Sequence, residues 1–323
     1  LQAASMSVLG ETEFAARFPS ALALALTAWI LLATLRRWQG GRWRAGLIAM
    51  AAFATCWMTQ YQAHAATIDA SLILITTLTM LLWLEAVTRP PRLDSALASA
   101  FGAGHSVLRP GGVATVPARH WIAFYACGAL GVLLKMPVIV AVWAVTALTY
   151  AVWNRHDTLA QLRRGRWPDW WPHLAGVAVG LAISLPWLIV VTAATDGRFI
   201  AEFIGRDVVG RAAESMEGHA GPVIYYVPVL LLLFFPWLWL LAFYVPQLSG
   251  RGRAPGMDLR RVRALLAWTV APIVMFSLAA TKLPHYIFPS FPALALLTGL
   301  ALDAACRRAD SVGLVARLTT PRR

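Results

Sequence analysis

Long apolar runs follow one another along most of the chain, and polar residues gather in the short stretches between them. A helix needs about 20 apolar residues to cross a membrane, so such runs predict membrane-spanning helices. The predicted segments are 14–35, 45–62, 68–87, 121–153, 174–195, 223–245, 264–280 and 284–304.

The segment 121–153 is too long for a single crossing. At about 1.5 Å per residue it would form a helix of about 50 Å, against a hydrocarbon core of about 30 Å. Lys135 and Pro137 lie in its middle. Proline interrupts helical hydrogen bonding, and lysine is costly in hydrocarbon. We therefore expect two helices with a turn at Lys135, and about nine spans in the whole chain.

Composition supports this reading, because 59% of the residues are apolar and only 13% are charged. Soluble domains are ~45–50% apolar and ~25% charged. A soluble globule of this composition would expose far more apolar surface than solubility permits, so the excess is expected to face lipid. The sequence therefore predicts an all-α polytopic integral membrane protein.

Charge is strongly unbalanced, with 28 basic and 15 acidic residues and a net charge of +13. In a soluble protein this excess would indicate nucleic acid, but in a membrane protein it more often marks cytoplasmic loops. Nine spans place most of the cations on one side, whereas eight spans would scatter them over both. We therefore expect no nucleic-acid partner. The cations left for the other side are Arg17, Lys135, Arg198, Arg206, Arg211 and Lys282.

Both lysines of the chain thus fall on the side where topology does not require cations. Charges of both signs gathered at one membrane surface indicate a polar site. The turn from Lys282 through His285 to Tyr286 could bind an anion, with lysine supplying charge to a phosphate while the other two donate hydrogen bonds. The Lys135 turn could share that anion. The alternative for both turns is a snorkelling lysine, joined at the first by interfacial aromatic rings.

Two further groups lie on the same predicted side. Arg206 and Arg211 could hold a phosphate or pyrophosphate, or could pair with nearby carboxylates, and His219 could be a ligand or belong to an ordinary glycine-rich turn. The carboxylates that begin with Glu13 and include Asp69 could hold a divalent cation or orient Arg17. Asp69 could equally be a helix N-cap.

The order of these motifs resembles one family. They are the series 13–22 (Glu-Phe-Ala-Ala-Arg-Phe-Pro-Ser-Ala-Leu), Asp69-Ala70, the Leu134–Pro137 turn, the 203–221 loop leading to Tyr225-Tyr226 and Pro236-Trp237, and 282–286 (Lys-Leu-Pro-His-Tyr). This order is similar to that of the bacterial polyprenyl-phosphate-dependent glycosyltransferases of the protein mannosyltransferase and aminoarabinose (lipid A) transferase superfamily. The resemblance runs from Leu1 to about Ala304.

The resemblance implies a GT-C type transmembrane helix bundle in residues 1–305, followed by a cytoplasmic arginine-rich tail in 306–323. It implies an enzyme of the bacterial inner membrane with a periplasmic active face. That enzyme would move a hexose or aminopentose, with inversion, from a polyprenyl-phosphate donor to a lipid or protein acceptor. Membrane lipids would surround the bundle. The phosphate of the polyprenyl donor would be bound by Lys135, Arg206, Lys282, Tyr286 and Arg17. The candidates for binding substrate or a divalent metal would be His219, His285, Asp69 and Glu13.

Family members carry the general base in an outer loop near their N-terminus, which would lie upstream of Leu1. The chain is thus expected to be an N-terminally truncated member that lacks the first span and first periplasmic loop, and its activity alone is left open. Two rival readings remain, a transporter or lipid flippase without transferase chemistry and a purely structural membrane subunit. In a transporter, we would expect charges near the midpoints of the spans and two related halves of the chain.

Overall fold

Helices make up all the regular secondary structure in the residues that the computed structural model describes, which are 1–88, 116–136, 138–155, 170–210, 221–248 and 258–319. The first half contains α1 (Gln2–Leu9), α2 (Glu13–Trp38), α3 (Arg44–Thr55), α4 (Trp57–His64), α5 (Asp69–Thr88), α7 (Ala118–Lys135) and α8 (Val138–Trp153). The second half contains α10 (Trp171–Ala194), α11 (Arg198–Glu202), the π-helix η1 (Phe203–Gly210), η2 (Val223–Tyr225), α13 (Tyr226–Leu233), α14 (Trp237–Tyr244), η3 (Val245–Leu248), α15 (Leu259–Leu278), η4 (Pro284–Ser290) and α16 (Phe291–Thr319).

Each predicted segment corresponds to a helix or to a broken pair of helices. The split within 121–153 is confirmed, because α7 ends at Lys135 and α8 begins at Val138. The predicted segment 45–62 forms α3 and α4, which meet at Cys56. The segment 223–245 is bent by 102° between α13 and α14.

Five helical segments in the described residues are long and apolar enough to cross a membrane, and the bent pair would be a sixth. The five are Glu13–Trp38, Asp69–Thr88, Trp171–Ala194, Leu259–Leu278 and Pro284–Asp310. Helices α3 and α8 are apolar but shorter. The all-helical membrane architecture is therefore confirmed, and the number of nine spans stays a prediction.

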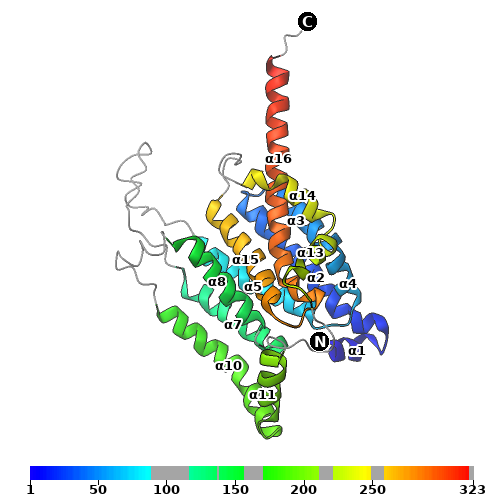
Figure 1. Cartoon of the computed structure of the whole chain (residues 1–323), viewed down its shortest axis with the longest axis vertical. Coiled ribbons are helices and arrows are strands. Elements are labelled where there is room, and N and C mark those ends of the chain that lie inside the picture. The colour runs from blue at the N-terminus through cyan, green and yellow to red at the C-terminus, as the bar shows by residue number, and fades with distance from the viewer. Residues whose placement is uncertain (89–115, 137, 156–169, 211–220, 249–257, 320–323) are drawn as a thin grey trace.

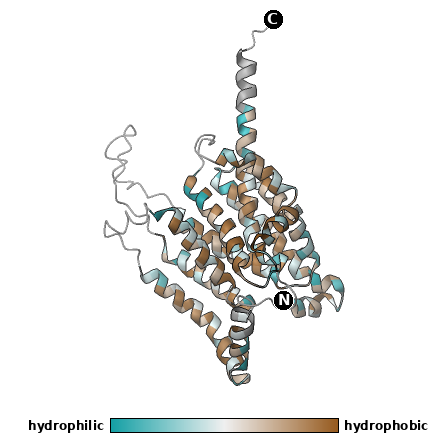
Figure 2. Cartoon of the chain, viewed as in Figure 1, coloured by the Kyte–Doolittle hydropathy of each residue, from teal (hydrophilic) through white to brown (hydrophobic). Residues whose placement is uncertain are grey.

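Helix α16 runs through the middle of the bundle, whereas α10 lies at its side (Figure 1). The most apolar stretch of the segment that contains α16 is 94% buried, whereas that of α10 is 11% buried. A Cβ added to Gly299 would lie 2.4 Å from the Ala45 carbonyl oxygen, so α16 can approach α3 this closely only with glycine there. Apolar residues are frequent along α10 (Figure 2), and several of the large ones, among them Leu174, Leu181 and Val190, are exposed, as expected of a helix that contacts lipid.

Charged side chains lie at two opposite ends of this bundle. We call the upper end in Figure 1 the arginine end; there Arg37 pairs with Glu85, and the side chain of Arg263 donates to Asn154 Oδ1. These contacts join the end of α2 to the end of α5, and the start of α15 to the end of α8. The described cations that were predicted to share one side therefore do share one end of the bundle.

The lysine end is the opposite end, which contains Asp69, Lys135, Lys282 and His285. It is formed by the starts of α2 and α5 and the ends of α7 and α15. Ser20 Oγ donates to the Thr67 carbonyl 3.2 Å away and so joins α2 to the turn before α5. The predicted boundary between residues 305 and 306 falls inside α16, which continues to Thr319.

Candidate functional site at the lysine end

An ion pair between two helix ends forms the centre of the lysine end. Lys135 Nζ lies 2.7 Å from Asp69 Oδ1, although the two residues are 66 positions apart in sequence. Asp69 is the first residue of α5 and Lys135 is the last of α7, so each charge also interacts favourably with its own helix dipole. The Asp69 side chain is 17% exposed and the Lys135 side chain is 33% exposed, so the lysine is partly accessible.

His285 approaches the same carboxylate from the other side. Its Nε2 lies 3.9 Å from Asp69 Oδ2, and its side chain is 29% exposed. The adjacent ring of Tyr286 packs against His285 edge to face, with the centroids 5.1 Å apart, and lies 5.0 Å from the ring of Phe276. The structure therefore brings the 282–286 turn to the turn at Lys135, as a shared site requires.

Lys282 lies at this end but faces its own chain. Its side chain is buried, with 4% exposure, and Nζ donates to the carbonyl oxygens of Ser277 at 2.8 Å and Ala279 at 2.6 Å. Helix α15 ends at Leu278, so the ammonium binds carbonyl groups that the helix end leaves without intrahelical partners. Lys282 therefore caps the end of α15 in the structure. Its predicted role in binding phosphate stays a prediction.

Tyr226 fixes the backbone of the lysine-bearing turn. Its hydroxyl donates to the Leu283 carbonyl 3.1 Å away, and its side chain is buried. The stem of Lys282 packs nearby, since a Cβ on Gly221 would lie 3.1 Å from Lys282 Cδ. Sequence reasoning did not assign this role to Tyr226. The paired tyrosines 225 and 226 after a glycine-proline turn were its only signal.

The remaining predicted residues are not joined to the Asp69 cluster in the same way. Arg17 pairs with Glu13 on its own helix at 3.1 Å, and these side chains are 49% and 83% exposed. The side chain of Arg206 and the whole of His219 lie outside the described residues. Their proposed roles, like those of Arg17 and Glu13, stay predictions.

The described residues contain no group of three or more His, Cys, Asp or Glu side chains that could hold a metal ion. Asp69 and His285 are the pair of such groups that the lysine end brings together. Protein sites for zinc commonly use three or four ligands. Binding of a divalent metal therefore stays a prediction.

These features define a class of protein. It is a multi-spanning helical membrane protein with a cation, a carboxylate and an imidazole at one end. A lysine that is partly exposed beside one carboxylate can accept a second anion, because its ammonium carries three donors. The position at the helix ends would let such an anion approach from the membrane surface. This arrangement suits an amphiphile with a charged head group.

Known proteins of this architecture are similar to the chain in sequence and structure. Residues 1–118 match the family described as dolichyl-phosphate-mannose-protein mannosyltransferase. An undecaprenyl phosphate-alpha-4-amino-4-deoxy-L-arabinose arabinosyl transferase from Sodalis glossinidius is 32% identical over 294 residues, which cover 91% of this chain and 46% of that protein. The enzyme of the same name from Pseudomonas paraeruginosa is 29% identical and is matched over 97% of this chain and 50% of that protein.

The crystal structure of ArnT from Cupriavidus metallidurans bound to undecaprenyl phosphate superposes with a TM-score of 0.71 at 25% identity. The match covers 98% of this chain and 52% of that one. The chain is thus related, in sequence and in its GT-C fold, to the polyprenyl-phosphate-dependent glycosyltransferases of the protein mannosyltransferase and aminoarabinose transferase superfamily. It spans about half the length of the curated relatives it matches.

Proposed function

We propose that the chain acts as a membrane glycosyltransferase that takes a sugar, a hexose or an aminopentose, from a polyprenyl-phosphate donor. The sugar goes with inversion to a lipid or protein acceptor, on the periplasmic face of the bacterial inner membrane. The cluster of Asp69, Lys135 and His285 at the end opposite the arginines is the observation that carries the proposal. The names of the relatives, which specify undecaprenyl phosphate and aminoarabinose, support this substrate class.

The electrostatics of the reaction explain why a lysine is useful here. The bond between the anomeric carbon and the phosphate oxygen breaks as the acceptor oxygen bonds to that carbon. The phosphate group gains one negative charge when it leaves. A cation placed beforehand at that phosphate stabilises the developing charge more than the ground state, which lowers the barrier. The acceptor proton passes to a base, and we assign that role to none of the described residues.

Asp69 positions the cation in this scheme. Its carboxylate holds Lys135 Nζ at 2.7 Å, while the other oxygen faces His285. The ammonium keeps two more donors that a phosphate oxygen could use. A bound donor would therefore place Lys135 between two anions, and Asp69 would fix its direction without using all of its hydrogen-bonding capacity.

The test reconstitutes the chain in liposomes with undecaprenyl phosphate carrying a radiolabelled sugar and with lipid A as acceptor. We expect the chain to retain undecaprenyl phosphate in preference to undecaprenol and to move label to the acceptor. A transporter or flippase would instead carry the intact donor across the bilayer without breaking the sugar–phosphate bond. Equal retention of the two lipids without label transfer would contradict the proposal.

A further inference from the structure

A surface hollow of about 190 Å³ lies beside the last turns of α2, at the arginine end. Trp29, Leu32 and Ala33 form an apolar wall, and Arg36 and Arg37 lie at its more polar side. Trp29 is 58% exposed, whereas Leu32, one helical turn later, is buried. The hollow therefore combines exposed apolar surface with two cations on one membrane-spanning helix.

The turn after α2 completes this hollow. Gly41 has a φ of 92°, which L side chains rarely adopt, and its N–H donates to the Arg36 carbonyl oxygen at 2.8 Å. This turn closes the helix end and folds the chain back, so that the ring of Trp43 lies 3.9 Å from the guanidinium carbon of Arg36. A guanidinium stacked in this way still presents N–H donors around its edge.

The charge around the hollow is positive. Glu85 pairs with Arg37, and Arg42 donates to the backbone and side-chain oxygens of Gln39, a neutral residue. Arg36 stacks on a neutral ring. Among the described residues around the hollow, Glu85 is the carboxylate that pairs with one of its two arginines, and this excess of positive charge favours an anion next to the apolar wall.

We propose that this hollow binds an anionic glycerophospholipid. Its phosphate would lie against Arg36, and the upper part of an acyl chain would lie against Trp29 and Ala33. Arginine with tryptophan at the end of a spanning helix matches the depth of the lipid head groups. Basic residues at the membrane surface beside a spanning helix attract anionic lipid head groups. Free phosphate would gain nothing from the apolar wall. The site is independent of the transferase proposal, because it lies at the other end of the bundle.

The test measures lipids retained by the purified full chain in native mass spectrometry, with phosphatidylglycerol compared against phosphatidylcholine. We expect the wild type to retain phosphatidylglycerol preferentially, and Arg36→Gln to weaken that retention about fivefold. Arg260→Gln is the matched control, because Arg260 is an exposed arginine at the same end that does not line the hollow. This control should retain the lipid as the wild type does.

A second variant tests the apolar half of the site. Trp29→Ala removes an exposed ring, so it should leave the thermal midpoint unchanged while it reduces phosphatidylglycerol retention severalfold. Inorganic phosphate at millimolar levels should not displace the lipid. Equal retention of the two lipids, equal losses in Arg36→Gln and Arg260→Gln, or displacement by inorganic phosphate would each overturn the proposal.

Discussion

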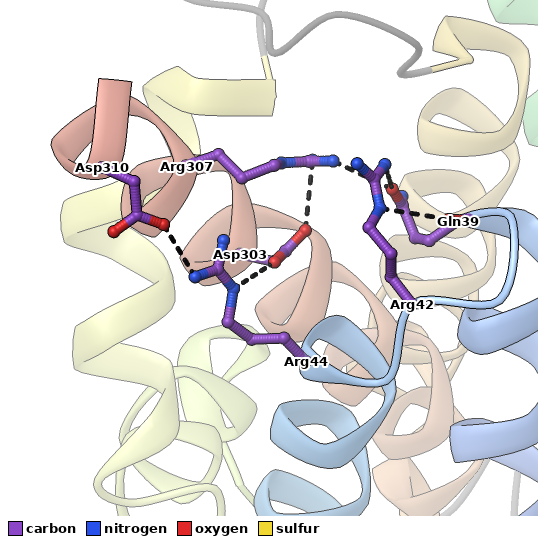
Figure 3. A network of polar contacts seen from close by, with 6 residues as sticks. All are labelled: Gln39, Arg42, Arg44, Asp303, Arg307 and Asp310. Atoms are coloured by element: carbon purple, nitrogen blue, oxygen red, sulfur yellow. Dashed lines mark hydrogen bonds and ion pairs between the residues drawn. The ribbon is translucent and has the colours of Figure 1, made fainter. Parts of the chain in front are cut away.

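The two ends of the bundle use charge in different ways. At the arginine end, the Asp303 side chain is 6% exposed. One of its oxygens accepts a hydrogen bond from Arg44 at 2.7 Å, and the other forms an ion pair with Arg307 at 3.2 Å (Figure 3). At the lysine end, Lys135 is 33% exposed and pairs with Asp69. The buried carboxylate at the first end is held by two planar guanidinium forks. The lysine at the second end carries a compact ammonium group, which has three N–H donors.

This difference suggests that the arginine-end network serves architecture, whereas the lysine-end pair can exchange partners. Arg44 joins the start of α3 to α16 through Asp303 and through Asp310, 2.9 Å away. Arg307 also donates to Gln39 Oε1 at 3.2 Å, which links α16 to the turn after α2. Several elements depend on this one network. The Asp69–Lys135 pair joins α5 to α7, and its lysine is partly exposed.

The largest expected effect is at the lysine end. Lys135→Ala should reduce sugar transfer by about a hundredfold or more, because it removes the cation beside the leaving phosphate. Transfer of radiolabel from undecaprenyl phosphate to lipid A measures the change. Lys135→Arg keeps the charge and is the control, with a smaller loss expected. Turnover of Lys135→Ala at the wild-type level would break the functional half of the comparison.

The next effect is at the arginine end and concerns stability. Asp303→Asn should lower the free energy of unfolding by about 2 kcal/mol, because two guanidinium groups lose a buried, charged acceptor. Thermal unfolding in detergent, followed by circular dichroism, measures the loss. Asp310→Asn is the matched control, since Asp310 is 69% exposed and should change stability by less than ~1 kcal/mol. Equal shifts in both variants would mean that burial of Asp303 does not matter.

Lys282 separates a structural role from a functional one. Lys282→Met keeps most of the buried stem but removes the donors to Ser277 and Ala279, so we expect a loss of about 1 kcal/mol in stability. Thermal unfolding gives the stability, and binding of undecaprenyl phosphate gives the second readout. Reduced stability with unchanged lipid binding would assign Lys282 to the end of α15 and remove it from the predicted phosphate site.

The smallest effect is expected for Arg17→Gln. The pair with Glu13 joins neighbouring turns of one helix and is largely exposed, so its loss should change stability by less than ~0.5 kcal/mol. If Arg17 also binds the donor phosphate, as the sequence predicts, affinity for undecaprenyl phosphate should fall severalfold. Lipid binding at the wild-type level would restrict the site to the Asp69 cluster.

The hydrophobic pattern determined where the helices lie and which of their ends share a side. It also predicted the break at Lys135, because proline and lysine both oppose a continuous helix within hydrocarbon. Lys135, Asp69 and His285 were predicted to lie on one side, and they meet at one end of the bundle. Their functional roles stay predictions. The Arg17–Glu13 pair agrees with the alternative in which the carboxylate orients Arg17, and the Lys282 ammonium binds the end of α15. The phosphate-binding roles of Arg17 and Lys282 stay predictions.

Only the tertiary structure decided which helix faces meet and which charges become partners. Lipid and protein interior are both apolar, so a spanning helix carries little contrast between its buried and lipid-facing sides. The sequence therefore could not show that α16 is central while α10 is peripheral. Asp69 and Lys135 lie 66 positions apart, and only the packing of α5 beside α7 brings their opposite charges together.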